Sequence, residues 1–348
     1  MSDRDVRELR AAPPSEAVRL SVVAPAFNEG PGIEPFLDRL SAHLAALGLA
    51  YEVIIVDDGS RDDTAARVAA RAARDPAVKL VRLSRNFGKE AALNAGLAHA
   101  AGAAVVQIDS DLQHPPELVA ELVAEWQRGA EIVYARRRSR EGESLVRRLA
   151  ARAFYGIFGA ISEIRLMEGL GDFILLDRKV VDAMLRLPER ERFTKGLYAW
   201  VGFRVAAVPF DVAPRAHGRS RFRLGRLMRF GMDAVTAFGS FPLRVWTYVG
   251  LTLAVLSMSY GVYIAVRTLV FGIDVPGYAS LMVAICFLSG VQLLGLGVIG
   301  EYLGRVLVEV KQRPLYLVRE TVGFDAEEGR ADAPLAAESP APPRRAAG

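Results

Sequence analysis

The sequence predicts an α/β domain with a mostly parallel sheet flanked by helices, followed by a two-helix transmembrane hairpin at the C-terminal end. Short β-rich runs alternate with helical patterns in the first part of the chain, as in consecutive βαβ units. Two long uncharged stretches follow, and each reaches the roughly 20 residues that a helix needs to cross a bilayer. A chain of 348 residues, 51% of them hydrophobic, has room for both parts.

Five short runs are predicted as strands of the sheet. They lack strict alternation of polar and apolar residues, as expected when helices cover both faces of a sheet. Between the first two runs, apolar residues recur at three- and four-residue steps from Ile33 to Leu47, which predicts a helix that Gly48 is suited to end. The predicted strands are Leu20–Ala24, Tyr51–Val56, Val78–Leu83, Ala103–Ile108 and Glu131–Tyr134.

The remaining segments follow from composition. Residues 1–17 are charged and have no apolar run of the kind found in secretory signals, so we expect a flexible N-terminus. The α/β domain is expected over 18–230 and the tail 325–348, rich in Ala, Pro and Glu, to be disordered. Between them we expect a basic juxtamembrane segment over 222–244, two transmembrane helices within 245–303 (about 245–267 and 276–300), and a second juxtamembrane segment over 304–324.

Positive charge flanks the hairpin on its outer sides. Arg229 and Arg244 precede the first span, Arg305, Lys311 and Arg313 follow the second, and only Arg267 and Asp274 lie between the spans. The positive-inside rule therefore predicts that the α/β domain and both termini are cytoplasmic.

Two arginine-rich stretches with interleaved apolar residues, near 143–161 and 215–229, are typical of helices at a membrane surface. Packing of the same stretches against the core of the domain is the alternative. The single cysteine, Cys286, excludes an intramolecular disulfide, and the G-x-G-x-x-G pattern from Gly295 to Gly300 lies inside a span, where it cannot bind a dinucleotide.

Polar residues gather where the predicted strands end. Asp109, Ser110 and Asp111 follow the fourth run, with Gln113 close behind, and two carboxylates at the end of a strand suit a divalent ion that grips a diphosphate. A solvated turn is the alternative for such a triplet. Pro25, Phe27 and Glu29 end the first run, and Asp57, Asp58 and Ser60 end the second, so three strand ends converge on one crevice.

Carboxylates after the second run could accept hydrogen bonds from a nucleobase or ribose, whereas Asp62, Asp63 and Thr64 fit a helix cap equally well. Lys89 follows a glycine at the start of a helix, where phosphate can approach, or it is an ordinary solvated residue. Guanidinium groups of Arg136, Arg215 and Arg221 suit a diphosphate, a lipid phosphate or anionic headgroups.

Several motifs occur in an order that resembles family 2 glycosyltransferases with a GT-A, Rossmann-like fold: APAFNEG, VIIVDDGSRDDT, LSRNFGKEAALNAG and DSDLQHPPE. Later motifs resemble the polyprenyl-phosphate glycosyltransferases, such as dolichol-phosphate mannose synthases and bactoprenol glucosyltransferases: GLGDFILLDRKVVDAM, RFTKGLYAWVGF, GRSRF and VQLLGLGVIGEYLGRVLVEVKQRPLYLV. The resemblance covers roughly Leu20 to Val318, and the chain carries Arg221 and Phe222 where the family commonly has Lys and Tyr.

The resemblance implies a role for each matching residue. It places Asp109, Asp111 and Gln113 at a Mg²⁺ or Mn²⁺ ion and the donor diphosphate, and Asp172 close to the reacting groups. Pro25, Phe27, Glu29, Asp57, Asp58, Ser60, Lys89, Ser110 and Gln113 would surround the nucleotide sugar, and Arg136, Arg215 and Arg221 the phosphates.

The reaction that these roles imply is an inverting transfer of a hexose or related sugar from a UDP- or GDP-linked donor to undecaprenyl or dolichyl phosphate. It would take place at the cytoplasmic face of the inner or plasma membrane and serve cell-envelope or glycan modification. No nucleic acid is an expected partner; Gly300 and Gly304 would permit close helix contact in a homo-oligomer. The alternatives are a processive or other family 2 membrane glycosyltransferase and a catalytically idle membrane scaffold.

Overall fold

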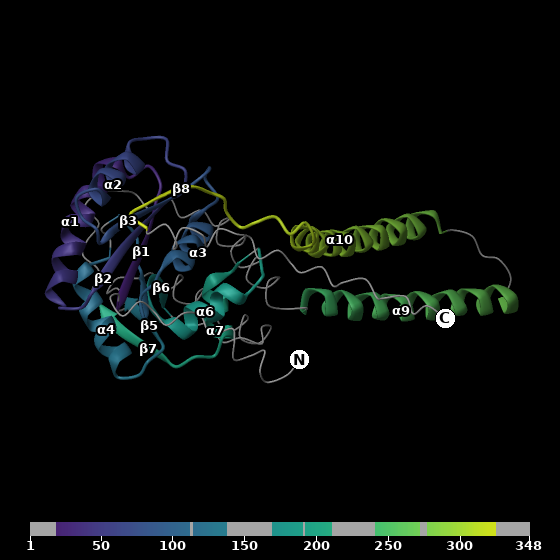
Figure 1. Ribbon diagram of the computed structural model, residues 1–348. Coiled ribbons are helices and arrows are strands. Elements are labelled where there is room, and N and C mark those ends of the chain that lie inside the picture. The colour runs from purple at the N-terminus through teal and green to yellow at the C-terminus, as the bar shows by residue number, and fades with distance from the viewer. Residues whose placement is uncertain are drawn as a thin grey trace, which may run out of the picture.

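A computed structural model of the chain describes residues 19–111, 114–137, 169–190, 192–210, 241–271 and 277–324. In this part of the chain an α/β domain lies beside a pair of long helices that extend away from it (Figure 1). The two parts correspond to the α/β domain and the hairpin that the sequence predicts.

The domain is built on a sheet with the strand order β7-β5-β6-β4-β1-β2-β3-β8. Strands β1 to β5 and β7 run in one direction, and β6 and β8 run against them, which confirms the mostly parallel sheet. The strands are β1 (Leu20–Ala26), β2 (Tyr51–Asp57), β3 (Val78–Leu83), β4 (Ala104–Gln107), β5 (Ile132–Arg137), β6 (Leu170–Asp177), β7 (Val205–Phe210) and β8 (Val318–Val322).

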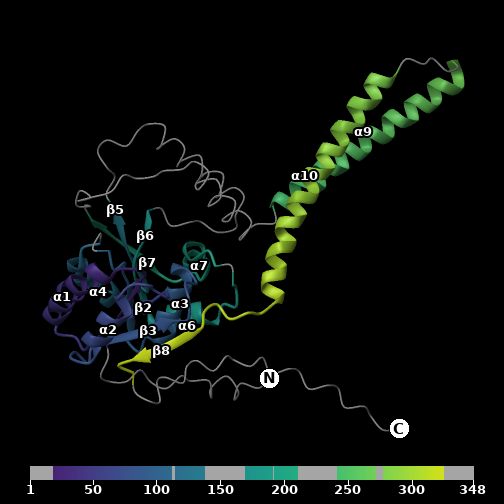
Figure 2. The same ribbon diagram turned by 90° about the horizontal axis from the view of Figure 1, so that it is seen from above.

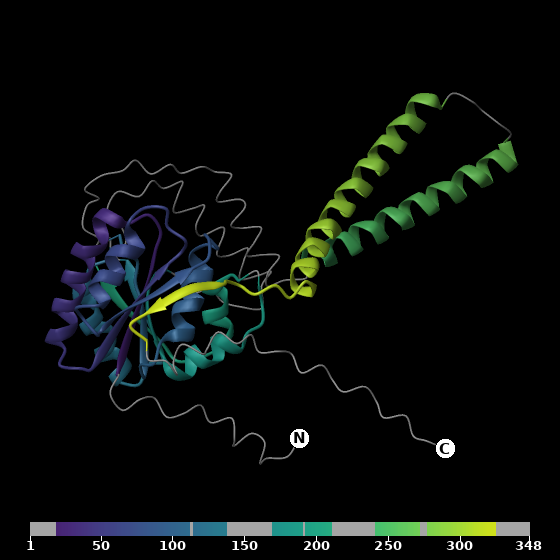
Figure 3. The same ribbon diagram turned by 45° about the horizontal axis from the view of Figure 1, so that its top comes forward.

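Helices cover both faces of the sheet, and this is why the strands are apolar on both sides. Apolar residues of α1, α2 and α4 form one buried cluster with the sheet, and those of α3, α6 and α7 form the other. In Figure 3 the purple helix α1 and the teal helices α6 and α7 lie on opposite sides of the sheet. The bounds are α1 (Gly30–Ala46), α2 (Thr64–Ala72), α3 (Lys89–His99), the short 3₁₀ helix η1 (Pro116–Leu118), α4 (Val119–Gln127), α6 (Arg178–Arg186) and α7 (Thr194–Trp200).

Helix α1 shows how the apolar spacing of the sequence becomes packing. Ile33, Phe36, Leu37, Leu40 and Leu44 are all buried, so the stripe predicted from their spacing is the face that α1 turns to the core. Gly48 follows the helix with a φ of 65°, the left-handed conformation that commonly ends helices.

Two helices, α9 (Phe241–Phe271) and α10 (Tyr278–Val310), are long and apolar enough to cross a membrane. Their large apolar side chains are exposed, with Leu269 at 86% and Phe271 at 83%, as suits a surface that faces lipid. The helices lie closest together near the domain and diverge towards their far ends (Figure 3). The indole of Trp246 on α9 lies against Gly295 of α10.

After α10 the chain returns to the domain and adds β8 to the free edge of β3, antiparallel to it (Figure 2). The Ser84 main-chain N–H donates to the Leu317 carbonyl over 2.8 Å, and Tyr316, Val318 and Phe324 pack against the cluster of α3, α6 and α7. The sequence predicts only a juxtamembrane segment here, because polar residues interrupt any apolar run. The strand covers an edge that would otherwise be open to aggregation.

Candidate functional site

A pocket of about 330 Å³ lies at the carboxyl ends of β1 to β4. This is where ligands bind in open α/β sheets, and it brings together the strand ends whose convergence the sequence predicts. The residues that line it are Pro25, Ala26, Phe27, Glu29, Asp58, Asn86, Gly88, Lys89, Asp109, Ser110 and Asp111.

Asp109 and Asp111 lie together with His114 at one side of this pocket. Each of the three offers a ligand atom, and these atoms all lie within 4.8 Å of one another. His114 packs near Phe173 and Phe210, with ring centroids 5.6 and 6.3 Å away, and its buried Nδ1 has no hydrogen-bond partner among the described residues. Burial lowers the pKa of His114 more than the nearby carboxylates raise it, so the ring is neutral near pH 7.

Two carboxylates and a neutral imidazole form a donor set that fits a divalent ion such as Mg²⁺ or Mn²⁺. The unpartnered Nδ1 of His114 is the observation that favours such an ion over a purely structural cluster. Gln113, which the family resemblance assigns to the ion, lies outside the described residues. His114 was not predicted, although it directly follows Gln113 in the sequence.

Lys89 connects this acidic cluster to Asp172. Its ammonium lies 2.6 Å from an Asp109 oxygen and 2.8 Å from an Asp172 oxygen, and Lys195 approaches the other Asp172 oxygen at 3.1 Å. Asp172 reaches this place because β6 runs antiparallel to β4, so the start of β6 lies at the same sheet end as the finish of β4. Lys195, on α7, was not predicted as a site residue. The motif that contains it, RFTKGLYAWVGF, contributes only to the family resemblance.

The charges of this group determine how each member is protonated. Burial alone would raise the pKa of Asp172, but the ammonium groups of Lys195 and Lys89 outweigh it and hold that pKa at about 2. Burial lowers the pKa of Lys89, yet its bonds to Asp109 and Asp172 leave the pKa above its usual value. At neutral pH Asp172 is therefore an anion and Lys89 a cation.

Asp58 shapes the wall of the pocket on the β2 side. Its carboxylate accepts hydrogen bonds from the Phe87 and Gly88 main-chain N–H groups over 2.7 and 2.9 Å. Burial raises the pKa of Asp58, and these two bonds oppose the rise. Gly59 has a φ of 69°, and a Cβ built there would lie 2.4 Å from the Arg85 carbonyl carbon, so only glycine fits this contact.

Asp57 and Ser60 lie behind the pocket and connect its loops. Asp57 is completely buried, lies 3.4 Å from the Arg82 guanidinium, and accepts a hydrogen bond from the Ser60 main chain over 3.2 Å. The Ser60 hydroxyl in turn accepts from the Asn28 N–H over 2.9 Å. Asp62 accepts hydrogen bonds from the main-chain N–H and hydroxyl of Thr64 and from the Gly30 N–H, so it connects the starts of α1 and α2. The N-cap residue of α2 is Asp63, which makes no side-chain capping bond.

The β1 side of the pocket presents an aromatic face and a carboxyl group. Phe27 is 42% exposed, which suits stacking of a nucleobase. Burial first, and then repulsion from Asp111 and Asp62, raises the pKa of Glu29. The Ser110 hydroxyl donates to the Pro25 carbonyl over 2.9 Å and so ties the loop after β4 to β1.

Of the predicted phosphate-binding arginines, only Arg136 is described. It is exposed near the end of β5, where it is paired in register with Leu170, two residues before Asp172. It therefore lies at the same end of the sheet as the pocket, without lining it. Arg215, Arg221 and the two amphipathic stretches near 143–161 and 215–229 lie outside the described residues.

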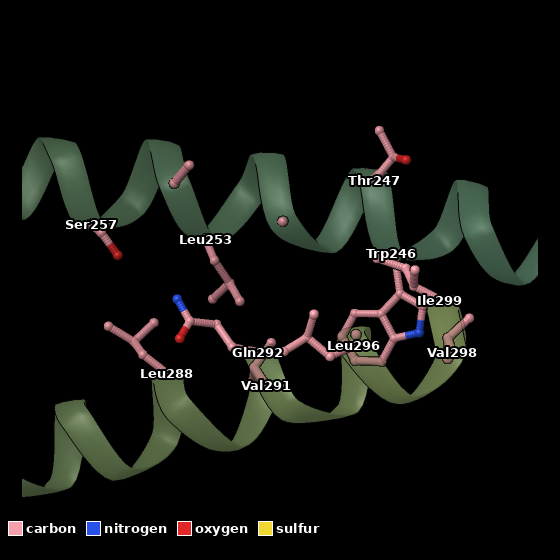
Figure 4. Close-up of a pocket in the computed structure, with 13 residues that line it drawn as sticks. Trp246, Thr247, Leu253, Ser257, Leu288, Val291, Gln292, Leu296, Val298 and Ile299 are labelled. Atoms are coloured by element: carbon pink, nitrogen blue, oxygen red, sulfur yellow. The ribbon is translucent and has the colours of Figure 1, made fainter. Parts of the chain in front are cut away.

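A larger cavity of about 810 Å³ lies between α9 and α10 (Figure 4). Its lining is mostly apolar, and Gln292 points from α10 towards α9 beside Ser257. The residues that line it include no carboxylate, which distinguishes it from the pocket at the strand ends.

Comparison with known proteins agrees with this organisation. The family described as Glycosyl transferase family 2 matches residues 21–185, and the family described as GtrB C-terminal hairpin matches residues 241–306. An uncharacterized glycosyltransferase of Synechocystis is 50% identical over 88% of this chain and 97% of its own length. A prophage-derived bactoprenol glucosyl transferase of Shigella flexneri is 43% identical, over 87% of this chain and 98% of its own.

A prophage bactoprenol glucosyl transferase homolog of Escherichia coli is 40% identical over 87% of this chain and 99% of its own length. Among solved structures, a mannosyltransferase from Pyrobaculum calidifontis in complex with GDP-Man and Mn²⁺ is 20% identical and covers 88% of this chain and 92% of its own. Its TM-score of 0.45 is too low to transfer any residue role. The identities to full-length relatives establish that the chain belongs to the family 2 glycosyltransferases, in the group with a C-terminal membrane hairpin that includes the bactoprenol glucosyl transferases.

Proposed function

We propose that the chain transfers a hexose or related sugar from a nucleotide-diphosphate sugar to a polyprenyl phosphate held in the membrane. The observation that carries the proposal is the gathering of Asp109, Asp111 and Asp172 with two lysines at one pocket, in a chain that also has two apolar membrane-length helices. Relatives named bactoprenol glucosyl transferase, at 40–43% identity, support the acceptor class.

The donor would lie along the ends of β1 to β4. Phe27 offers a face for the base, and Glu29 and Asp58 offer oxygens towards the ribose or base, with Pro25 and Ser110 completing the wall. Asp57 and Ser60 act from behind by holding the loops. Asp109 and Asp111, with Gln113 or His114, would hold a Mg²⁺ or Mn²⁺ ion, which supplies electrostatic stabilisation of the departing diphosphate.

The acceptor phosphate would lie on the side of Asp172. A phosphate monoester has a second pKa of about 6, so it is largely a dianion at neutral pH and needs no strong general base. Asp172, with a pKa of about 2, is a poor base, and we assign it the task of positioning Lys89 and Lys195 towards the phosphate. Arg136, Arg215 and Arg221 would add positive charge around the phosphates.

The reaction is then a single displacement with inversion. A phosphate oxygen of the acceptor attacks the anomeric carbon from the face opposite the leaving group, the new carbon–oxygen bond forms, and the bond to the nucleotide diphosphate breaks. Both bonding electrons leave with the diphosphate, and no covalent enzyme intermediate is required. The chain contributes by aligning the two substrates at the reacting distance.

The hairpin would keep the pocket at the surface of the inner or plasma membrane, where the acceptor headgroup lies. The charge pattern around α9 and α10 favours a cytoplasmic location for the domain and both termini. Because the acceptor cannot leave the bilayer, this location raises its effective concentration at the pocket.

The test is to incubate the purified chain in lipid vesicles with a panel of UDP- and GDP-sugars and polyprenyl phosphate, and to identify lipid products by mass. We expect one donor to yield a polyprenyl-phosphate sugar with release of the nucleoside diphosphate. If no donor gives a lipid product, or if a polysaccharide grows instead, the proposal is wrong.

A further inference from the structure

Several polar bonds of Arg190 join the end of α10 to the α/β domain. The Arg190 main-chain N–H donates to Glu309 Oε1 over 2.7 Å, and the Arg190 guanidinium lies 3.6 Å from Glu309 Oε2. The same guanidinium donates through Nε to the Arg313 carbonyl over 2.6 Å. Arg190 thus bonds to both the last turn of α10 and the chain just beyond it.

The segment that carries Arg190 is itself fixed to the domain. Two residues further on, the Arg192 guanidinium donates to the Met184 and Leu187 carbonyls over 2.9 and 2.6 Å, and to Asn94 on α3. Arg192 is followed by Phe193 and then α7, where Lys195 pairs with Asp172. The chain from Arg190 to Lys195 therefore connects the last turn of α10 to the Asp172 carboxylate, and Arg192 fixes its middle to the domain.

We propose that Arg190 and Glu309 form a clamp that fixes the second membrane helix relative to Lys195 and Asp172, and thereby sets the height of the pocket above the bilayer. This inference rests on the proposed function, since it concerns delivery of a membrane-held acceptor. Arg190 and Glu309 are positioning residues that touch neither substrate. β8, which follows at the far edge of the sheet, holds the same segment at a second point.

Geometry explains why one clamp matters. α10 leads into the bilayer, and the lipid phosphate has a narrow range of depths at the membrane surface. An acceptor displaced by about 1 Å can lose on the order of a hundredfold in rate. A short water-soluble acceptor can approach the pocket at any depth, so its reaction does not depend on how the hairpin is held.

The test compares Glu309→Ala with Glu301→Ala, in the full chain in vesicles. Glu301 is on the same helix but pairs with Arg305 of that helix, 3.3 Å away, so its loss removes a charge without touching the clamp. For Glu309→Ala we expect kcat/KM to fall about tenfold with long-chain polyprenyl phosphate in the bilayer, and to stay within about twofold with a short soluble prenyl phosphate. Glu301→Ala should change neither, and Glu309→Gln, which keeps an acceptor for the Arg190 N–H, should give an intermediate loss.

Equal losses with the two acceptors, or no loss with either, would overturn the clamp. Hydrogen exchange provides a readout without substrate: the amides of Arg190 and of α7 should exchange faster in Glu309→Ala than in Glu301→Ala, and equal exchange would also refute the inference. If the wild-type chain fails with both acceptors while the exchange difference is present, the proposed function fails and the clamp stands.

Discussion

Lys195 is the residue of the site whose removal is most informative, because its cation is one of two that hold Asp172. In Lys195→Met, Lys89 is the one ion-pair partner that Asp172 keeps among the described residues. At the 3.1 Å separation of Lys195 and Asp172, two unit charges interact with about 5 kcal/mol at an effective dielectric constant of about 20. Both side chains are more than one-third exposed, at 36% and 38%, so solvent screening reduces this to about 1 kcal/mol.

If that energy orients the groups that receive the acceptor, Lys195→Met should lower kcat/KM for polyprenyl phosphate about fivefold and leave the KM for the donor nearly unchanged. Initial rates with each substrate varied in turn measure this. Lys179→Met, at an exposed lysine of α6, is the matched control and should have no effect. An unchanged kcat/KM in Lys195→Met would refute the role given to the cations around Asp172.

Three further predictions concern pH and stability. The rate should fall on the acid side near pH 6, where the acceptor phosphate takes up a proton. The residual activity of Asp172→Asn should show the same fall, because a group with a pKa of about 2 does not titrate there. Disappearance of this fall in Asp172→Asn would make Asp172 the base. Gly59→Ala should lower the free energy of unfolding in urea by about 2–4 kcal/mol. Gly48→Ala has a similar φ but nothing near its Cβ position, so it should lower that free energy by only about 1 kcal/mol. Equal losses in the two variants would contradict the clash with Arg85. A chain that ends at Val310 keeps both membrane helices but lacks β8, so its urea midpoint should fall; an unchanged midpoint would show that β8 adds no stability.

The part of the fold that follows from local pattern is predictable from the sequence. β1 to β5 lie where the apolar runs predict them, because parallel strands buried on both faces need continuous apolar segments. β6, β7 and β8 were not predicted as strands. β8 contains Arg319, Glu320 and Thr321, so only its pairing with β3, which is distant in sequence, makes it a strand.

The residues of the candidate site also fall into those that local pattern predicts and those that it does not. Asp109, Asp111, Glu29 and Asp58 each follow a strand of one parallel set, and the rule that such strand ends meet is enough to gather them. Asp172 came only from the family resemblance, since its place beside Lys89 depends on the reversed direction of β6. Lys195 depends on how α7 packs over that strand, which no local pattern reveals.

The proposed function depends on carboxylates at the strand ends that bind a divalent ion during transfer of a sugar to a membrane phosphate. The most direct measurement is the rate of lipid glycosylation by metal-stripped protein as Mg²⁺ or Mn²⁺ is added back, for the wild-type chain and for Asp109→Asn. We expect no activity without the ion, saturable recovery in the wild type, and little recovery in Asp109→Asn. Full activity in the metal-stripped protein, or full recovery in Asp109→Asn, would contradict it.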